Sequence, residues 1–367
     1  MRPDETADCR SFQTYPRAAD PPVSPSATPL ATGARLCRSE LRNAAFLGAL
    51  VVFAFLLLDR ADLLGGAGVL RDLPVCVTIS AVVHMPQLLL TALAWRTLIR
   101  QPVAPSLLGM THLRWVRESA GTLLPGGGVL GQVWAARQLA RCGVPSELAG
   151  ATATVDVTAE LAAQLLFTLL GLGLLLGQRN RGGVITGMAV TGCVMVAGAA
   201  AGLVAIQRLP RHRRLAGLRR HLARSLPRAW RGGVADIHAA ILCLHAERRR
   251  LATAVACHSL AWTLGAVEVA GVLYLLGRKL SPAEAIIIES MGQALRNAGF
   301  MLPGAAGIQE GAIVAAAALV GVPAGPALTA SLVRRAREVL MALPGIVAWQ
   351  RTESAVRKRI SGPLVRR

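Results

Sequence analysis

The sequence has little of what nucleic-acid-binding proteins and soluble enzymes need. Aromatic residues make up 4% of the chain and charged residues 16%, although the formal net charge is +20. Few rings are therefore available to stack on bases, and no RNA- or DNA-binding motif occurs, so nucleic acid is excluded as a partner. A nucleotide-binding loop and a metal-ligand motif are also missing from the sequence. We predict no catalytic site and no cofactor.

Cysteine is scarce and scattered. The seven cysteines are odd in number and isolated from one another, so we expect no disulfide or zinc framework. His238, His245 and Glu247 could be drawn as a metal cluster. They lie, however, on an amphipathic stretch beside three consecutive arginines, which favours a solvated or interfacial face. No metal site is predicted.

Apolar residues dominate instead, at 53% of the chain, and they gather in several long runs. Such runs are typical of helices that cross a lipid bilayer. Many of the arginines stand at the ends of these runs, where positive charge sets the orientation of membrane helices. The sequence predicts an all-α, polytopic integral membrane bundle with about six full spans and two broken re-entrant hairpins.

One polar break interrupts an apolar region between Gly299 and Gly311, with the sequence GFMLPGAAGIQEG. Pro303 removes a backbone donor, and the glycines that follow it accept a positive φ. We expect a helix that enters from Pro282 to end at this break and a second helix to begin near Ile308. Two half-helices would then meet at a polar point inside the membrane.

A similar break lies 178 residues upstream. Aligning Pro125 with Pro303 without gaps gives 13 identities over the 47 residues from Ser119 to Leu165, including a Leu-Pro-Gly and a Gly-Val-Pro. Three predicted spans separate the two hairpins, and an odd number of crossings inverts the second repeat. Inverted repeats of broken helices are typical of secondary transporters. The alternative is a bundle held by packing, in which the prolines only kink helices.

Arginine sets the predicted topology. Residues 207–250 hold twelve arginines against two acidic residues, and such an excess stays on the cytosolic side. With this loop inside, both termini are cytosolic as well. The predicted parts are a disordered cytosolic tail (1–34), one transmembrane domain (35–350) with repeat cores at 106–176 and 284–349, and a basic cytosolic tail (351–367). The predicted spans are Ala44–Leu58, Val75–Trp95, Leu148–Leu176, Val184–Ile206, Leu251–Leu276 and Ala327–Trp349, and the hairpins are Ser106–Leu124 with Val129–Ala140, and Pro282–Val320.

Several charged residues are expected near the middle of the membrane. Asp156 and Glu160 share one helix face, and Arg334 and Glu338 occupy the aligned positions of the second repeat. An unpaired charge at that depth costs about 2.5 to 3.5 kcal/mol. We expect Asp156 or Glu160 to pair with Arg334 or Arg337 across the repeat interface, around a wet cavity. The alternative is that the arginines lie nearer the surface and extend toward water.

Segments of both halves resemble a known family. ESMGQALRNAGFMLPGAAGIQEGA and SLVRRAREVLMALPGIVAWQ, with ESAGTLLPGGGVLGQ and VDVTAELAAQLLF upstream, look like HpnL, the hopanoid-biosynthesis-associated membrane proteins. These proteins belong to a wider flippase-like group that includes the transmembrane part of lysylphosphatidylglycerol synthases. The resemblance covers roughly residues 35–350. It implies a role in handling lipid, a hopanoid or its derivatives, at a bacterial inner membrane.

The residues and the resemblance together predict a substrate-binding site. Free N–H groups at the helix starts after the two Pro-Gly breaks suit an anionic or hydroxylated group. In the wider group an acidic residue often follows the first glycine motif, whereas this chain has Gln132. The candidate site residues are Gly126, Gln132, Asp156, Glu160, Arg296, Asn297, Gly304, Gln309, Glu310, Arg334, Arg337 and Glu338.

The predicted function is that of a flippase-like protein that handles a hopanoid or a related lipid at the bacterial inner membrane. Its expected partner is a membrane lipid, either a hopanoid or a phospholipid. Two alternatives stay open. One is a membrane enzyme, or an accessory subunit, of lipid-headgroup modification. The other is a scaffold that docks hopanoid-biosynthesis enzymes on its arginine-rich loop.

Overall fold

The computed structural model describes residues 67–99, 104–124, 127–177, 231–298 and 308–361, with isolated positions between 187 and 205. These residues belong to one compact unit, Leu64–Arg367, and a separate unit, Met1–Leu63, lies outside the described residues. The predicted tail, the predicted first span and most of the predicted span Val184–Ile206 therefore also lie outside them. All regular structure in the described part is helical, which confirms the predicted all-α class.

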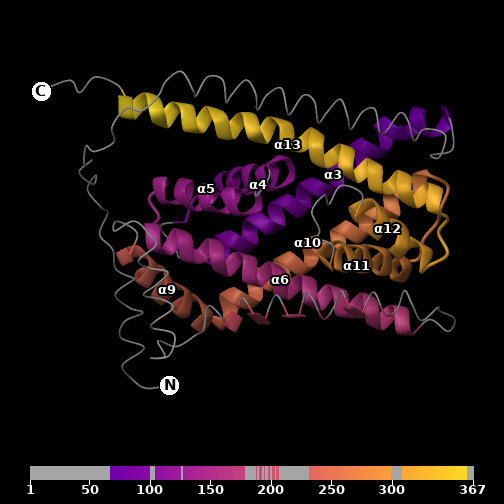
Figure 1. The fold of residues 1–367 in the computed structure, drawn as a ribbon, viewed down its shortest axis with the longest axis horizontal. Helices are drawn as coiled ribbons and strands as arrows, with labels where there is room; N and C mark the ends of the chain where they lie inside the picture. The colour runs from indigo at the N-terminus through magenta and orange to yellow at the C-terminus, as the bar shows by residue number, and fades with distance from the viewer. Residues whose placement is uncertain are drawn as a thin grey trace, which may run out of the picture. The chain divides into compact units, whose positions relative to one another are not determined.

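The helices of the described part follow the predicted order (Figure 1). The boundaries predicted at Pro282 and Ile308 are confirmed, while the break between them, residues 299–307, lies outside the described residues. The helices are α3 (Ala67–Thr97), α4 (Leu107–Leu123), α5 (Gly127–Arg141), α6 (Ser146–Leu176), α9 (Arg231–Ala246), α10 (Arg248–Leu275), α11 (Pro282–Ala298), α12 (Ile308–Ala318) and α13 (Ala324–Ser361).

Three of the described helical segments are long and apolar enough to cross a membrane: Leu73–Thr97, Ser146–Leu176 and Arg248–Leu275. At 1.5 Å per residue, a helix of about 20 residues is sufficient for the hydrocarbon core. α13 is longer still, with 38 residues and Pro344 in its interior. Its cluster of charged residues between Arg334 and Glu338 lowers its mean hydropathy. The chain is therefore a membrane protein built of apolar helices.

Local sequence explains where several helices begin. At the start of α11, the Ser281 backbone N–H donates to Glu284 at 2.8 Å, and the Glu284 N–H donates to the Ser281 hydroxyl at 3.3 Å, which forms a capping box. The two Gly-Val-Pro triplets each precede a long helix, α6 or α13. Their glycines, Gly143 and Gly321, have φ of 96° and 78°, a conformation that glycine adopts without strain. Sequence positions 178 residues apart thus form the same turn.

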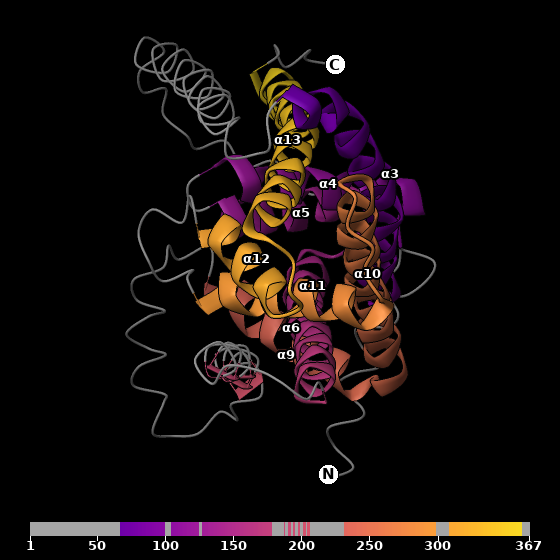
Figure 2. The same cartoon turned by 90° about the vertical axis from the view of Figure 1, so that its right-hand side faces the viewer.

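Helices from the two halves of the chain pack on each other. α4 packs on α13, α6 packs on α11, and α3 packs along α10 (Figure 2). Glycine allows the first two crossings to be close. A Cβ atom added at Gly345 of α13 would overlap Ser119 of α4, and one added at Gly171 of α6 would overlap Ser290 of α11. Each crossing therefore places a glycine of a long helix against a serine of a short one.

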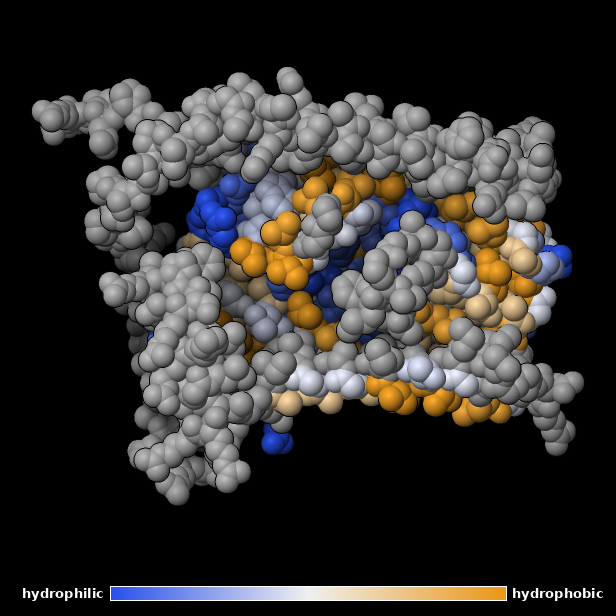
Figure 3. Space-filling model, viewed as in Figure 1, coloured by the Kyte–Doolittle hydropathy of each residue, from blue (hydrophilic) through white to orange (hydrophobic). Residues whose placement is uncertain are grey.

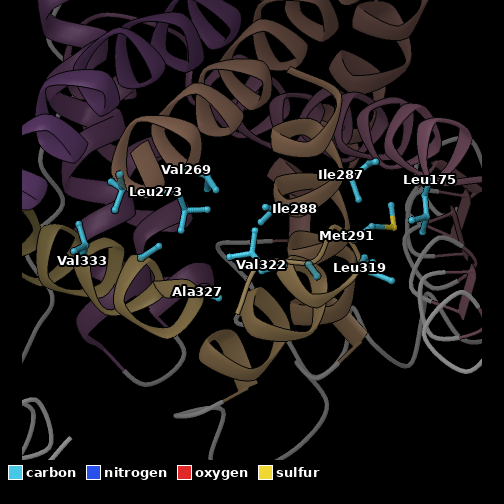
Figure 4. Close-up of a cluster of buried hydrophobic side chains, with 14 of the residues drawn as sticks. Leu175, Val269, Leu273, Ile287, Ile288, Met291, Leu319, Val322, Ala327 and Val333 are labelled. Atoms are coloured by element: carbon cyan, nitrogen blue, oxygen red, sulfur yellow. The ribbon is translucent and has the colours of Figure 1, made fainter. Parts of the chain in front are cut away.

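Apolar side chains fill both ends of the helical unit. One cluster joins the end of α10, the end of α6 and the start of α13, and Figure 4 shows its members Leu273, Leu175 and Val333. At the other end, one cluster contains Trp95, Trp134 and Leu139. A third cluster there joins α9 to α6. Most of the charged side chains described below come from the middle turns of the long helices, away from these clusters, whereas Glu310 comes from the first turn of α12 and Arg296 from the last turn of α11.

Two expectations about the arginine-rich region need correction. Residues 207–250 were expected to form a loop, but residues 231–246 form α9 and residues 248–250 begin α10. α9 packs on α6 through Ala240, Ile241 and Leu244. An apolar stripe on α9 is the physical reason, since it can be buried only by packing. Cys243 on the same helix is disulfide-bonded, contrary to the expectation, whereas Cys142 and Cys257 are free thiols.

Candidate functional site

A polar cavity of about 420 Å³ lies among α3, α4, α6, α10, α11, α12 and α13. Figure 3 shows hydrophilic side chains in the middle of one face, flanked by apolar ones. The cavity is unusual for an apolar bundle because many of its lining side chains are ionisable. They are His84, Arg114, Glu118, Glu160, His258, Glu268, Glu289, Arg296, Arg334, Arg335, Arg337 and Glu338.

The first set of charges joins α4 to α6, and we call it the α4–α6 network: Arg114, Arg117, Glu118, Asp156 and Glu160. Arg114 donates to Asp156 at 3.1 Å, to Glu160 at 2.9 Å and to Glu118 at 2.8 Å. Arg117 donates to the same two α6 carboxylates at 2.8 and 3.1 Å. Both guanidinium groups thus bridge both α6 carboxylates. Charge-assisted, two-pronged contacts of this kind fix geometry as well as charge.

His258 of α10 extends this network. Its Nε2 lies 3.0 Å from Asp156 Oδ1, and both side chains are buried. Ligand atoms of Asp156, Glu160 and His258 lie within 4.8 Å of one another, as in a metal site. Two arginine cations already contact both carboxylates, however, and a metal ion would be repelled by them. We therefore assign no metal to this group.

The second set of charges joins α11, α10 and α13. We call it the α11–α13 network: Glu268, Glu289, Glu310, Arg334, Arg335, Arg337 and Glu338. Arg334 donates to both oxygens of Glu289, at 3.1 and 2.8 Å. Glu268 lies 3.6 Å from Arg334 and 3.4 Å from Arg337. Ser80 of α3 also donates to Glu268, at 2.6 Å.

The rest of this network lies at the start of α12. Gln309 donates to Glu338 at 3.3 Å, and Arg335 donates to Glu310 at 3.2 Å. Arg335 also lies 3.6 Å from Glu338. The QEG sequence that follows the second break therefore contacts the charged turn of α13 directly.

The predicted pairing between the repeats is wrong. Asp156 and Glu160 pair with Arg114 and Arg117, and Arg334 pairs with Glu289 and Glu268. The physical reason is proximity, because each long helix finds opposite charges on the short helix of its own repeat. The alternative of surface arginines is also wrong, since Arg334 and Arg337 are only 6% and 5% exposed.

Of the other eight candidate residues, the structure brings four together: Arg296, Gln309, Glu310 and Glu338. Arg296 lines the cavity, and among the described residues its side chain has no hydrogen bond or ion pair within the usual distances. Asn297 lies in the last turn of α11, where only the backbone is described, and Gly126 and Gly304 lie outside the described residues. Gln132 is not at the cavity; it donates to the Ala153 carbonyl.

Sequence reasoning missed the basic half of the α4–α6 network and the polar residues of α3 and α10. A signal was present in α4, where Arg117 and Glu118 follow Arg114 at spacings of three and four residues, which places the three charges on one side of the helix. Glu268 gave a similar signal, as an acidic residue deep inside an apolar helix.

The two networks carry opposite signs on corresponding helices. In the first repeat the short helix α4 supplies arginines and the long helix α6 supplies carboxylates. In the second repeat α11 supplies a carboxylate and α13 supplies arginines. Asp156 and Arg334, which align in sequence, are thus opposite in charge. The cavity between them offers both cationic and anionic groups to a ligand.

No curated protein and no solved structure matches the chain significantly. A protein family described as the lysylphosphatidylglycerol synthase TM region has a model that matches residues 43–345. This range covers well over half of the chain, including α3 to α12 and most of α13. The chain therefore belongs to the family of the lysylphosphatidylglycerol synthase TM region.

Proposed function

We propose that the chain is a flippase-like protein that carries the headgroup of a hopanoid or a related lipid through the polar cavity. The family match suggests a membrane protein related to lipid handling. The observation that carries the proposal is the cavity of about 420 Å³, lined by cations and anions inside apolar helices. A polar headgroup crossing a bilayer needs such a lining, because hydrocarbon offers it no hydrogen bonds.

We propose further that the two halves are an inverted repeat. Three observations support this relation: the helix order of α4 to α6 recurs in α11 to α13, α6 and α13 begin 178 residues apart, and the positive-φ glycines Gly143 and Gly321 align. In transporters built this way, substrate sites lie near the midplane between the repeats, and one repeat moves against the other.

The ion pairs suit this movement. Arg114 and Arg117 pair with carboxylates of their own repeat, and Arg334 pairs with Glu289 of its own repeat. The two repeats can thus shift relative to each other without separating these buried pairs, which would cost about 3 to 5 kcal/mol each. Arg296, at the cavity, is the cation best placed to receive an anionic or hydroxylated headgroup.

The proposed setting is the bacterial inner membrane, with both chain termini in the cytosol. The ends of the described helices are consistent with this arrangement. Arg250 at the start of α10 donates to the Thr97 and Ile99 carbonyls at the end of α3. Glu353 of α13 accepts from Gln138 of α5. These ends, which we assign to the cytosolic side, thus meet one another.

Lipid copurification tests the substrate class. The full-length protein is purified in mild detergent, and its lipid extract is compared by mass spectrometry with that of the source membrane. Enrichment of a hopanoid over bulk phospholipid is the expected result. In Arg296→Gln the enrichment should fall, whereas in Arg278→Gln, which changes an exposed arginine away from the cavity, it should not. A lipid extract identical to bulk membrane would count against the proposal.

A further inference from the structure

Three polar residues of α3 connect the two charge networks. Ser80, His84 and Gln87 are spaced four and three residues apart, so they share one helix face. Gln87 Nε2 donates to Glu268 at 3.3 Å, in the α11–α13 network. His84 Nε2 lies 3.6 Å from Glu118 Oε2, in the α4–α6 network. His84 Nδ1 and Gln87 Oε1, 3.3 Å apart, complete the bridge.

This chain of contacts decides which nitrogen of His84 carries hydrogen. The Glu268 carboxylate only accepts hydrogen bonds, so the Gln87 amide must turn its NH₂ group toward it. The Gln87 oxygen then faces His84 Nδ1, and Nδ1 must be the donor. In neutral His84 the remaining nitrogen, Nε2, therefore carries a lone pair that faces the Glu118 carboxylate. Two acceptors oppose each other until a proton arrives.

The balance of charges also indicates that the α4–α6 side of the cavity can bind a proton. The α4–α6 network has two arginines against three carboxylates. In the α11–α13 network three arginines face four carboxylates, and Arg296 beside it makes the numbers equal. One negative charge on the α4–α6 side is thus unmatched while His84 and His258 are neutral. A single proton would balance it.

His258 is a less suitable acceptor for that proton. Its Nε2 already faces Asp156, and its buried Nδ1 has no hydrogen-bond partner among the described residues. A proton on Nδ1 would lack an acceptor and would lie near Arg114 and Arg117, which share the Asp156 carboxylate. A proton on His84 Nε2 would instead lie between the ring and Glu118.

We propose that His84 is a proton-binding site and that its proton is the coupling ion for lipid movement; the second part rests on the proposed function. The proton adds to the lone pair of Nε2, an N–H bond forms, and the same proton leaves to water on release, so no other bond changes. On α4, His84 faces Glu118, which Arg114 also contacts. Through Gln87 it reaches Glu268 of α10, which Arg334 and Arg337 of α13 contact. Protonation ties α3 to α4, and proton release frees that contact.

Nitrogen NMR tests the site without any transport assay. The full-length protein, labelled with ¹⁵N-histidine, is titrated in detergent, and His84→Gln assigns the His84 signals. We expect neutral His84 to be the Nδ1–H tautomer, with the added proton on Nε2. In Glu118→Gln the proton should bind less tightly, by at least tenfold, whereas in His112→Gln, an exposed residue away from the cavity, binding should not change. The Nε2–H tautomer, or no effect of Glu118→Gln, would overturn the site.

Proteoliposomes test the coupling separately. A fluorescent lipid analogue reports lipid movement and an entrapped pH dye reports proton flux. Lipid movement by the wild type should respond to an imposed pH gradient. His84→Gln and His84→Arg, whose guanidinium stays charged, should both lose that response. If lipid moves in the wild type without any pH response, the coupling fails while the proposed function stands. If no lipid moves yet NMR shows the expected tautomer, the proposed function and the coupling fail while the site stands.

Discussion

At the residue scale, the molecule is organised by buried arginines that each contact more than one carboxylate. Arg114 touches three carboxylates and Arg334 touches two. Burying a charge in a low-dielectric interior is costly unless it is paired and hydrogen-bonded. Sharing carboxylates among arginines meets this requirement and keeps several polar groups available at the cavity. Removing one member should therefore harm the fold through the charge left behind.

The Glu289–Arg334 pair gives a stability prediction. Glu289→Gln leaves a buried guanidinium whose remaining contacts are the Gly265 carbonyl at 3.5 Å and the Glu268 carboxylate at 3.6 Å. We expect a loss of about 3 to 5 kcal/mol in the free energy of unfolding. The double variant Glu289→Gln with Arg334→Gln removes both charges and should recover part of this loss. Thermal unfolding in detergent measures both. A double variant less stable than the single one would mean that the pair is not the reason for the loss.

Gly321 gives a second prediction at this scale. Its φ is 78°, and a Cβ atom added to it would meet nothing within 4 Å, so only backbone strain opposes a side chain there. We expect Gly321→Ala to lower the free energy of unfolding by about 1 to 2 kcal/mol. Gly173→Ala is the matched control, because Gly173 lies inside α6 and is equally open; it should be neutral or slightly stabilising. Equal changes in the free energy of unfolding for Gly321→Ala and Gly173→Ala would contradict the backbone strain predicted at Gly321.

At the element scale, two crossings join the halves of the chain. α13 crosses α4 where Gly345 faces Ser119, and α6 crosses α11 where Gly171 faces Ser290. Small residues let backbones approach closely, which is how helices associate in lipid. At both crossings a glycine of one half of the chain lies against a serine of the other half. Ser119 at the first crossing also lines the cavity, so this crossing helps to set the size of the cavity.

A destabilising substitution at one helix crossing should be compensated by a substitution of the residue that it contacts. Gly171→Ala places a methyl group against the Ser290 side chain, and we expect overpacking to cost about 1 to 3 kcal/mol. Ser290→Gly removes the opposing side chain, so the double variant should regain most of that loss. The coupling free energy from the four unfolding curves is the measurement. If the effects of the two substitutions on the free energy of unfolding simply add, the two residues are not in contact.

At the same scale, the sequence predicted the helices well and the contacts poorly. Proline and glycine chemistry is local, so it predicted the starts of α11 and α12 at Pro282 and Ile308. It also predicted the equivalence of the two Gly-Val-Pro turns. The partners of Asp156 and Arg334 were wrong because pairing depends on which helices lie side by side. α9 was expected as part of a loop because arginines flank it densely on both sides, although the helix itself contains Arg231 alone and carries an apolar stripe.

At the scale of the whole molecule, the proposed topology has one orientation in the membrane. The turn after α5 should face the cytosol, and the turn between α10 and α11 should face the opposite side. Cys142 stands in the first turn as an exposed free thiol, and Lys279 is exposed in the second. Both turns lie at the ends of predicted spans, so they report on sidedness directly.

Cysteine labelling tests this orientation in intact spheroplasts. One variant keeps Cys142 alone, and a second has no native cysteine and carries Lys279→Cys. An impermeant maleimide should label the Lys279→Cys variant and leave Cys142 unlabelled until the membrane is opened. Neighbouring atoms partly desolvate the exposed Cys142 thiol, which raises its pKa, so labelling is done at mildly alkaline pH, where more thiolate is present. Labelling of Cys142 in intact cells would reverse the assigned topology.

The central claim is that lipid headgroups pass through the cavity between the two networks. Its most direct measurement is the rate at which a fluorescent lipid analogue crosses the bilayer of proteoliposomes containing the full-length protein. The account predicts faster movement than in protein-free vesicles, a loss of at least tenfold in Arg296→Gln, and wild-type rates in Arg278→Gln, with all proteins equally folded and incorporated. Equal rates in Arg296→Gln and wild type, or no movement above protein-free vesicles, would contradict it.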